Sequence, residues 1–369
     1  MAIIKPKYYN LKSILSKDAQ YNIVIGERSN GKTYACLEYG LKQYFKTGKQ
    51  FAIIRRFQED FKGRRGASVF DAHINNGVIE KLSGGKWSHI YYFSQRWYLC
   101  RYDEKGNRIR DEIPICYGFT LTTAEHDKGN SYPNINTIIF DEFLTRTIYL
   151  PDEFTLFTNL ISTIIRQRDN VKIFMLGNTV NKYGCPYVDE MGLKHLKDMK
   201  QGDIDVYRYG NTDLLVAVEY CKPNKEGKPN NYYFAFDSPK LSMITGGAWE
   251  IGIYPHLPIK YRPKDVALYI YINYSGEWLC GEIISHEEGL FLFIRPQTKE
   301  LTETELNNNI IYTTDYSHKP NYYRRITEPQ NPVTKKIAQL VYADRLFYAN
   351  NECGEIMRNY LQWCTKSDL

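Results

Sequence analysis

The stretch YNIVIGERSNGKTYACL, residues 21–37, joins a short apolar run to a helical pattern through a loop bounded by two glycines. The loop has the spacing G-x-x-x-x-G-K-[ST]. In such a loop the backbone N–H groups surround phosphate oxygens, the lysine reaches the outer phosphates and the threonine hydroxyl binds Mg²⁺. We therefore predict a site for ATP and Mg²⁺ formed by Gly26, Glu27, Arg28, Ser29, Asn30, Gly31, Lys32 and Thr33.

The residues on either side of this loop fit that prediction. Residues 21–25 are typical of a buried strand, and residues 32–45 carry apolar side chains at helical spacing. The alternative is a lysine-capped turn without a ligand, which the strand before the loop and the helix after it make less favoured. The predicted fold class is α/β, with an N-terminal P-loop ATPase domain built on a mostly parallel sheet.

A second apolar strand, residues 138–140, ends at Asp141 and Glu142. A buried parallel strand delivers the residues at its carboxyl end to the ligand crevice of the sheet. We expect Asp141 to hold Mg²⁺ together with Thr33, and Glu142 to activate the attacking water. An apolar strand followed by two acids is weak evidence alone, but it becomes strong because a phosphate loop precedes it.

A third apolar strand, residues 171–176, ends at Gly177 and Asn178. In ATPases of the additional-strand type, the strand beside the acidic one carries a polar residue that senses the γ-phosphate. Asn178 is placed for that role. A turn that simply ends the strand explains the same residues equally well.

Length and composition limit the number of domains and the class of protein. The chain has 369 residues and 43% hydrophobic content, which is enough for two domains with real cores. No segment approaches the roughly 20 apolar residues that span a bilayer, and the eight cysteines stand singly, so we expect a protein with reduced thiols that stays in the compartment where it is made. Predicted domains are an ATPase domain at 1–222, a linker at 223–250 and a C-terminal α+β domain at 251–369, with three antiparallel strands in 266–296 and helices in 334–349 and 354–364.

Three runs of sequence carry a family resemblance: IGERSNGKTYA, KGNSYPNINTIIFDEF and IIRQRDNVKIFML. Together they resemble the genome-packaging ATPases of small protein-primed tailed bacteriophages, the phi-29-type, terminase-like motors. The similarity covers most of residues 8–186 and becomes faint in the C-terminal third. It implies an additional-strand P-loop ATPase that forms a homomeric ring, expected to be a pentamer, on the portal of an empty capsid and drives double-stranded viral DNA inward.

The same resemblance implies a location and further partners. The protein is expected in the cytoplasm of the infected bacterial host, transiently attached to the prohead. The sequence does not fix the ring size, and it leaves open whether a structural packaging RNA takes part. Two rival functions are a helicase-like translocase acting on free DNA or RNA and a structural protein that binds ATP without hydrolysis. The single nucleotide core argues against the first, and Glu142 argues against the second.

Further catalytic residues follow from the resemblance. Arg166 falls where the family has its trans-acting arginine finger, and Lys128 falls where the family has a second basic residue that faces the neighbour's nucleotide. Arg146 lies one place away from another family arginine, so its role is undecided. An arginine from a neighbouring subunit can stabilise the charge of phosphoryl transfer. The alternative for Arg166 is a surface ion pair with Asp169.

Basic residues after the second strand are candidates for DNA contacts. Gln58 stands where the relative carries a lysine, so Lys62, Arg64 and Arg65 are expected to take over the contact with the phosphate backbone. Their segment is rich in glycine. A solvated surface is the default explanation for such clusters.

The C-terminal strands suit a fold of the ribonuclease-H type, with which the large packaging motors of other phages end. A two-metal nuclease needs several converging carboxylates. The middle of residues 266–276 holds no acid, while Asp265 and Glu277 lie at its ends. We therefore predict a vestigial ribonuclease-H-like fold, kept for docking, without nuclease activity.

Overall fold

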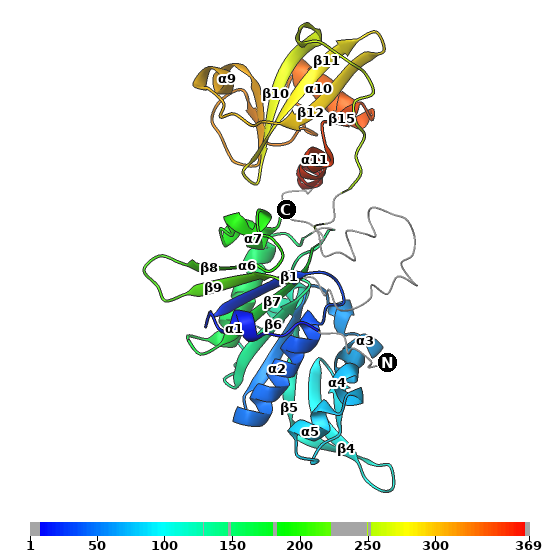
Figure 1. Cartoon of the computed structure of the whole chain (residues 1–369), viewed down its shortest axis with the longest axis vertical. Helices are drawn as coiled ribbons and strands as arrows, with labels where there is room; N and C mark the ends of the chain where they lie inside the picture. Colours follow the sequence, from blue (N-terminus) through cyan, green and yellow to red (C-terminus); the bar gives the residue numbers. More distant parts are fainter. Residues whose placement is uncertain are drawn as a thin grey trace, which may run out of the picture. The chain divides into compact units, whose positions relative to one another are not determined.

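The computed structural model describes residues 8–127, 129–146, 149–179, 183–222, 249 and 252–365. It divides into an N-terminal unit, residues 1–180 and 186–249, and a C-terminal unit, residues 181–185 and 250–369 (Figure 1). Most of the predicted linker lies outside the described residues, so its boundaries stay a prediction. Among the helices that the structure describes, none is long and apolar enough to cross a membrane.

The N-terminal unit is built on a nine-stranded sheet with the order β3-β4-β5-β2-β6-β7-β1-β9-β8 (Figure 1). The six strands from β5 to β9 are parallel, and antiparallel strands pair at both edges. The predicted α/β class with a mostly parallel sheet is confirmed, and one strand, β7, lies between the loop strand β1 and the acidic strand β6. The strands are β1 (Tyr21–Gly26), β2 (Gln50–Arg55), β3 (His89–Phe93), β4 (Arg96–Tyr102), β5 (Arg108–Thr120), β6 (Ile135–Asp141), β7 (Lys172–Asn178), β8 (Ile204–Arg208) and β9 (Leu215–Tyr220).

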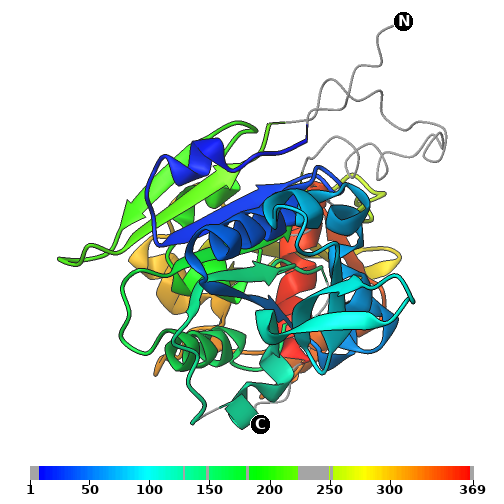
Figure 2. The same cartoon turned by 90° about the horizontal axis from the view of Figure 1, so that it is seen from below.

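Two longer helices cover opposite faces of this sheet (Figure 2). Helix α2 (Lys32–Thr47) shares one apolar core with Ile139 of β6. Helix α6 (Glu153–Ile165) stacks Phe157 on Phe140, with ring centroids 5.2 Å apart. Because neighbouring residues of a strand point to opposite faces, these contacts place α2 and α6 on different sides of β6.

The segment between β2 and β3, which the sequence assigns to helix or loop, folds as a chain of short helices. These helices cover one face of β3, β4 and β5: Trp97 Nε1 donates to the Gly66 carbonyl at 2.9 Å, and the rings of Phe61 and Phe70 pack on Trp97. The short helices of the unit are α1 (Lys12–Leu15), η1 (Gln58–Phe61), α3 (Arg64–Ala67), η2 (Ser68–Phe70), α4 (Asp71–Asn75), α5 (Val78–Leu82), η3 (Leu121–Asp127), α7 (Pro186–Glu190) and η4 (Lys194–Lys197).

The C-terminal unit contains a six-stranded sheet with the order β14-β13-β10-β11-β12-β15. Strands β10, β11 and β12 are antiparallel, as predicted, whereas β13 runs parallel to β10 and β15 parallel to β12. Tyr183, far upstream in the chain, joins the apolar core of this unit. The elements are η5 (Pro263–Asp265), β10 (Val266–Tyr274), β11 (Glu277–His286), β12 (Gly289–Pro296), α9 (Glu303–Asn308), β13 (Ile310–Thr313), β14 (Tyr322–Tyr323), α10 (Pro332–Tyr342), β15 (Leu346–Tyr348) and α11 (Asn351–Cys364).

Candidate active site

The loop between β1 and α2 closes around the ammonium group of Lys32. Lys32 Nζ donates to the carbonyl oxygens of Gly26 at 3.2 Å and Glu27 at 2.7 Å. It also donates to the Oδ1 atoms of Asn30 and Asn178, both at 3.2 Å. The side chain is 5% exposed, and burial lowers the pKa of its amine. A buried cation whose described partners are neutral oxygens fits an anionic ligand such as phosphate.

The backbone of the loop is tightly wound. Gly31 caps α2 at φ 92°, a conformation that L-residues rarely adopt. At Gly26, a Cβ would lie 2.9 Å from the Cβ of Cys221, so a side chain has no room there. Helix α2 begins directly after the loop, and its first N–H groups and dipole favour an anion at this place.

Thr33 and Asp141 meet at the carboxyl edge of the sheet. Thr33 Oγ1 lies 3.2 Å from both carboxylate oxygens of Asp141, which is 6% exposed. Hydroxyl and carboxylate oxygens are ligands that Mg²⁺ accepts, usually together with phosphate oxygens and water. These two residues therefore fit an Mg²⁺ ion beside the loop.

Arg55, at the end of β2, pairs with both acids at the end of the neighbouring strand β6, Asp141 and Glu142. Its Nη2 donates to Asp141 Oδ2 at 2.7 Å, and its Nη1 lies 3.3 Å from Glu142 Oε2. Arg55 is not among the site residues predicted from the sequence. Its place at the end of a strand was a usable signal, but the pairing of β2 with β6 was not known. Arg55 already donates to Asp141 Oδ2, so Mg²⁺ would either share this carboxylate with Arg55 or displace the guanidinium from it.

Hydrogen bonds from Arg56 fix the backbone at Glu142. Glu142 has φ 63°, a strained value for a non-glycine residue, and its side chain is 63% exposed. Arg56 donates to the carbonyl oxygens of Glu142 at 3.2 Å and Phe143 at 2.9 Å. Its guanidinium also makes two 2.8 Å hydrogen bonds to the buried carboxylate of Glu153. Arg56 thus fixes the turn that aims Glu142 outward.

Arg166 lies apart from this cluster. It caps the end of α6 at φ 46°, and its Nη2 donates to the Asn130 carbonyl at 2.8 Å. Within the part of the chain that the structure describes, it pairs neither with Asp169 nor with the acids of its own site. The alternative of an Arg166–Asp169 ion pair is therefore wrong. Lys128 lies outside the described residues.

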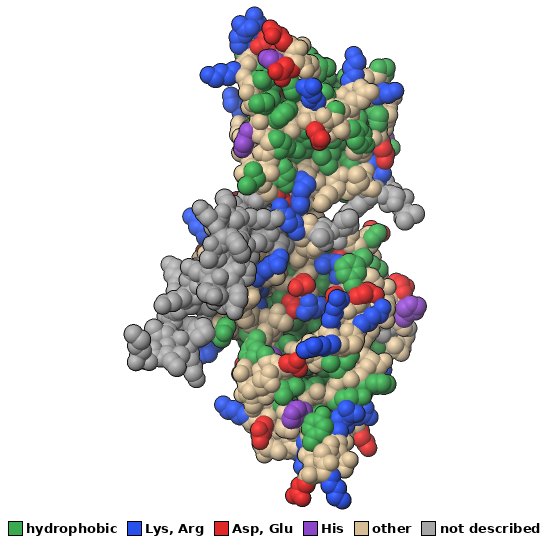
Figure 3. Space-filling view, turned by 90° about the vertical axis from the view of Figure 1, so that its right-hand side faces the viewer, with side chains coloured by type: hydrophobic (Ala, Val, Ile, Leu, Met, Phe, Trp, Pro, Cys, Tyr) green, Lys and Arg blue, Asp and Glu red, His purple; other side chains and the backbone are tan. Residues whose placement is uncertain are grey.

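The candidate DNA contacts are exposed side chains around the start of α3. Lys62 pairs with Glu59 at 2.9 Å, and Arg65 Nη1 donates to the Glu59 carbonyl at 3.3 Å. Arg64 makes no side-chain hydrogen bond or ion pair with any described residue. Basic and acidic side chains are interspersed on the face seen in Figure 3. Arg146 follows β6 and directly precedes residues that the structure does not describe.

The two acids considered for a nuclease site, Asp265 and Glu277, lie too far apart to bind the same metal ions. Asp265 precedes the first residue of β10, while Glu277 pairs with Tyr274, the last residue of that strand. Nine residue steps along the strand separate these positions by about 30 Å. Between them on the sheet, the buried Glu282 of β11 accepts a hydrogen bond from Arg295 at 2.6 Å.

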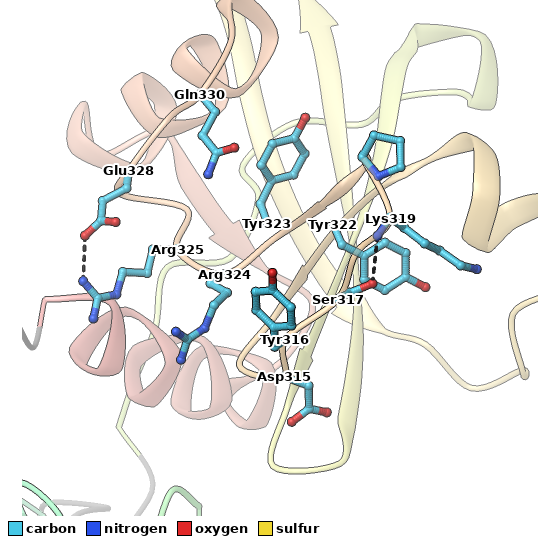
Figure 4. Close-up of a pocket in the computed structure, with 11 residues that line it drawn as sticks. Asp315, Tyr316, Ser317, Lys319, Tyr322, Tyr323, Arg324, Arg325, Glu328 and Gln330 are labelled. Atoms are coloured by element: carbon cyan, nitrogen blue, oxygen red, sulfur yellow. Dashed lines mark hydrogen bonds and ion pairs between the residues drawn. The ribbon is translucent and has the colours of Figure 1, made fainter. Parts of the chain in front are cut away.

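A polar pocket of this unit is lined by basic and aromatic side chains (Figure 4). Arg325 pairs with Glu328 at 2.7 Å, and the Arg324 guanidinium lies 5.3 Å from the centre of the Trp363 ring. Tyr316, which is 76% exposed, stands at its edge. Figure 4 shows the Glu328 carboxylate turned toward Arg325, with Asp315 on a separate segment.

Known proteins of one kind, phage DNA packaging proteins, are similar to this chain over most of its length. Residues 3–75 and 103–195 match the model of the podovirus DNA encapsidation protein (Gp16) family. The chain is 27% identical over 330 residues to the DNA packaging protein of Bacillus phage PZA, covering 87% of this chain and 90% of that protein. It is 26% identical over 330 residues to the DNA packaging protein of Bacillus phage phi29, with the same coverage.

Two solved structures share the fold. The phi-28 gp11 DNA packaging motor covers 99% of this chain and 100% of its own, with a TM-score of 0.55 and 19% identity. The phi-29 viral genome packaging motor assembly covers 96% and 99%, with a TM-score of 0.54 and 21% identity. The likeness of fold thus extends over both units. Because the family model matches the loop and the acidic strand, and the relatives align over most of both chains, this protein belongs to the podovirus DNA encapsidation family.

Proposed function

We propose that this protein is an ATP-driven motor that moves double-stranded viral DNA into a preformed capsid. One observation carries the proposal: Lys32, Thr33 and Asp141 converge at the carboxyl edge of a parallel sheet, in a chain whose relatives are DNA packaging proteins. The loop supplies an anion site, and the acidic strand supplies a metal ligand. A site for MgATP follows from the two together.

The residues of the site divide the work. Lys32 would exchange its bonds to the loop carbonyls for the outer phosphate oxygens, and Thr33 and Asp141 would hold Mg²⁺, which neutralises phosphate charge when bound. Glu142, exposed and fixed in its turn, orients and deprotonates the attacking water. Asn178 already contacts Lys32, so a change at the γ-phosphate reaches β7 through this hydrogen bond.

The proposal includes a homomeric ring, a pentamer, seated on the capsid portal in the cytoplasm of the infected bacterium. In the ring, Arg166 and Lys128 act on the nucleotide of the neighbouring subunit. Arg166 is exposed at the end of α6 and forms no ion pair with the described acids of its own site, which supports an outward role. A structural packaging RNA is a further candidate partner at the portal.

The decisive experiment measures ATP hydrolysis alone, with duplex DNA, and with duplex DNA plus empty capsids. A packaging motor is expected to be fully active only with DNA and capsids and to protect the DNA from added nuclease. A helicase-like translocase would be fully stimulated by free nucleic acid. A protein that binds ATP without turnover in all three conditions would refute the motor.

We propose a vestigial ribonuclease-H-like fold for the C-terminal unit, with docking as its role. The strand order β12-β11-β10-β13-β14, with three antiparallel strands followed by two parallel ones, supports this fold.

We predict that the full chain cleaves no DNA in Mn²⁺, because Asp265 and Glu277 lie at opposite ends of β10. Gel assays test this. Cleavage that survives Lys32→Ala but is lost with Asp265→Asn or Glu277→Gln would contradict the prediction.

We also propose that Lys62, Arg64 and Arg65 contact the DNA backbone. Replacing one true contact with glutamine should make the salt dependence of DNA affinity shallower by about one unit. Arg64→Gln should have a larger effect than Lys62→Gln, since Glu59 already neutralises part of the Lys62 charge. Unchanged slope and unchanged DNA-stimulated hydrolysis in the triple variant would mark these residues as ordinary surface.

A further inference from the structure

Strands β3, β4 and β5 have one face that the short helices do not cover. Figure 1 shows β4 and β5 (cyan) at one end of the N-terminal unit, beside α4 and α5. Trp97 and Leu99 belong to the core beneath those helices, so the alternate positions of β4 point the other way. We call this surface the arginine–tyrosine face; it consists of Tyr91, Phe93, Arg96, Tyr98, Tyr102, Arg108, Arg110 and Tyr117.

Three arginines of this face lie over tyrosine rings. The guanidinium carbon of Arg108 is 3.6 Å from the centre of the Tyr91 ring, and that of Arg110 is 4.5 Å from the Tyr98 ring. A third, Arg96, lies 5.9 Å from the ring centre of Tyr117. Stacking on a ring restrains a guanidinium group and leaves its N–H edges free to bind. The face therefore presents preorganised donors.

The positive charge of these arginines is not compensated. Throughout the described ranges, Arg96, Arg108 and Arg110 form no ion pair, although Asp111 and Glu112 follow directly in the sequence. Other exposed arginines do pair: Arg208 with Asp213 at 3.7 Å, and Arg262 with Asp265 at 3.5 Å. The complementary partner of the face is therefore an anion.

We propose that the arginine–tyrosine face binds the phosphate backbone of double-stranded DNA. The inference rests on the proposed function, which brings duplex DNA to this protein. Arginine forks bind phosphate oxygens in pairs, which favours a phosphodiester chain. Single strands are held mainly by bases stacked on open aromatic rings, but here guanidinium groups occupy the rings of Tyr91 and Tyr98. The exposed rings of the face, Phe93 and Tyr102, lie at the ends of β3 and β4. This geometry favours an intact duplex.

The test uses the full chain and a fluorescent duplex of mixed sequence, with binding followed by anisotropy over a series of salt concentrations. Each phosphate contact contributes about 0.9 to the slope of log affinity against log salt. The double variant R108Q/R110Q is expected to have a slope shallower by about 1.8 and, in 0.1 M salt, an affinity lower by roughly 60-fold. The control R208Q/R262Q also removes two exposed positive charges and should change affinity by less than about twofold.

A second variant, R108K/R110K, keeps the charge but loses the forked geometry. It should keep the slope and bind more weakly than the wild type. If R108Q/R110Q, folded by circular dichroism and able to bind ATP, keeps both affinity and slope, the face does not bind DNA. If R108Q/R110Q loses affinity for single-stranded DNA but keeps its affinity for the duplex, the proposal is also overturned. A wild-type chain that binds no duplex at all would overturn the proposed function as well.

Discussion

Glu142→Gln is expected to bind MgATP about as tightly as the wild type and to hydrolyse it roughly 10²–10⁴-fold more slowly. The amide keeps the size of the side chain, but it cannot take a proton from the attacking water. Arg56 holds the backbone of residue 142 through carbonyl oxygens, so the turn should survive the change. Single-turnover hydrolysis and nucleotide binding by calorimetry measure the two effects separately.

The matched control is Glu104→Gln, an exposed carboxylate in the turn between β4 and β5. It removes the same charge from the same unit and should leave turnover unchanged. Lys32→Ala is expected to abolish tight nucleotide binding with or without Mg²⁺, whereas Asp141→Ala should weaken binding only when Mg²⁺ is present. Wild-type turnover in Glu142→Gln would remove the base role from Glu142.

The parts of the site that follow from short-range pattern could be predicted from sequence. Local residue patterns identify the loop, its flanking strand and helix, and the acidic end of β6. Since residues that follow a parallel strand lie at the carboxyl edge of the sheet, these patterns also predict where the residues lie. The nine-stranded sheet then brings Thr33 and Asp141 together, although 108 residues separate them. The meeting follows because parallel strands share one carboxyl edge.

Adjacent arginines show what local pattern cannot resolve. Arg55 and Arg56 look alike in sequence, as one basic cluster. Arg55 faces the two acids, while Arg56 turns into the interior toward Glu153, 97 residues away. The alternation of a strand explains that the two side chains diverge, but the partner of each depends on which strand and helix pack beside β2. That packing is a property of the whole unit.

The alternative considered for Arg166, an ion pair with Asp169, was wrong for a related reason. Proximity in sequence suggested it, but the end of α6 is in a left-handed conformation at residue 166, and the guanidinium is directed to the Asn130 carbonyl. Likewise, Tyr183 lies within the sequence predicted for the first domain, residues 1–222, yet it packs in the core of the second unit. Composition gives no signal for such an exchange of a few residues.

Arg166→Ala is expected to bind ATP nearly as well as the wild type and to hydrolyse it roughly 10³–10⁵-fold more slowly. Binding should survive because Lys32 and the loop hold the phosphates within one subunit. Hydrolysis should fail because the arginine spreads the charge of the transition state over the transferred phosphoryl group. The same assays as for Glu142→Gln measure both quantities, but they do not reveal which subunit supplies the arginine.

Mixing Arg166→Ala with Glu142→Gln separates the two cases. Each variant is nearly inactive alone, but in a ring assembled from equal amounts about a quarter of the interfaces join an intact Glu142 to a neighbour's intact Arg166. Part of the activity should therefore return. An arginine that acts within its own subunit restores nothing, because every site still lacks one group. The double variant Glu142→Gln/Arg166→Ala, mixed with either single variant, is the control and should stay inactive. Absence of recovery in rings shown by native mass spectrometry to be mixed would leave Arg166 as a residue of its own subunit.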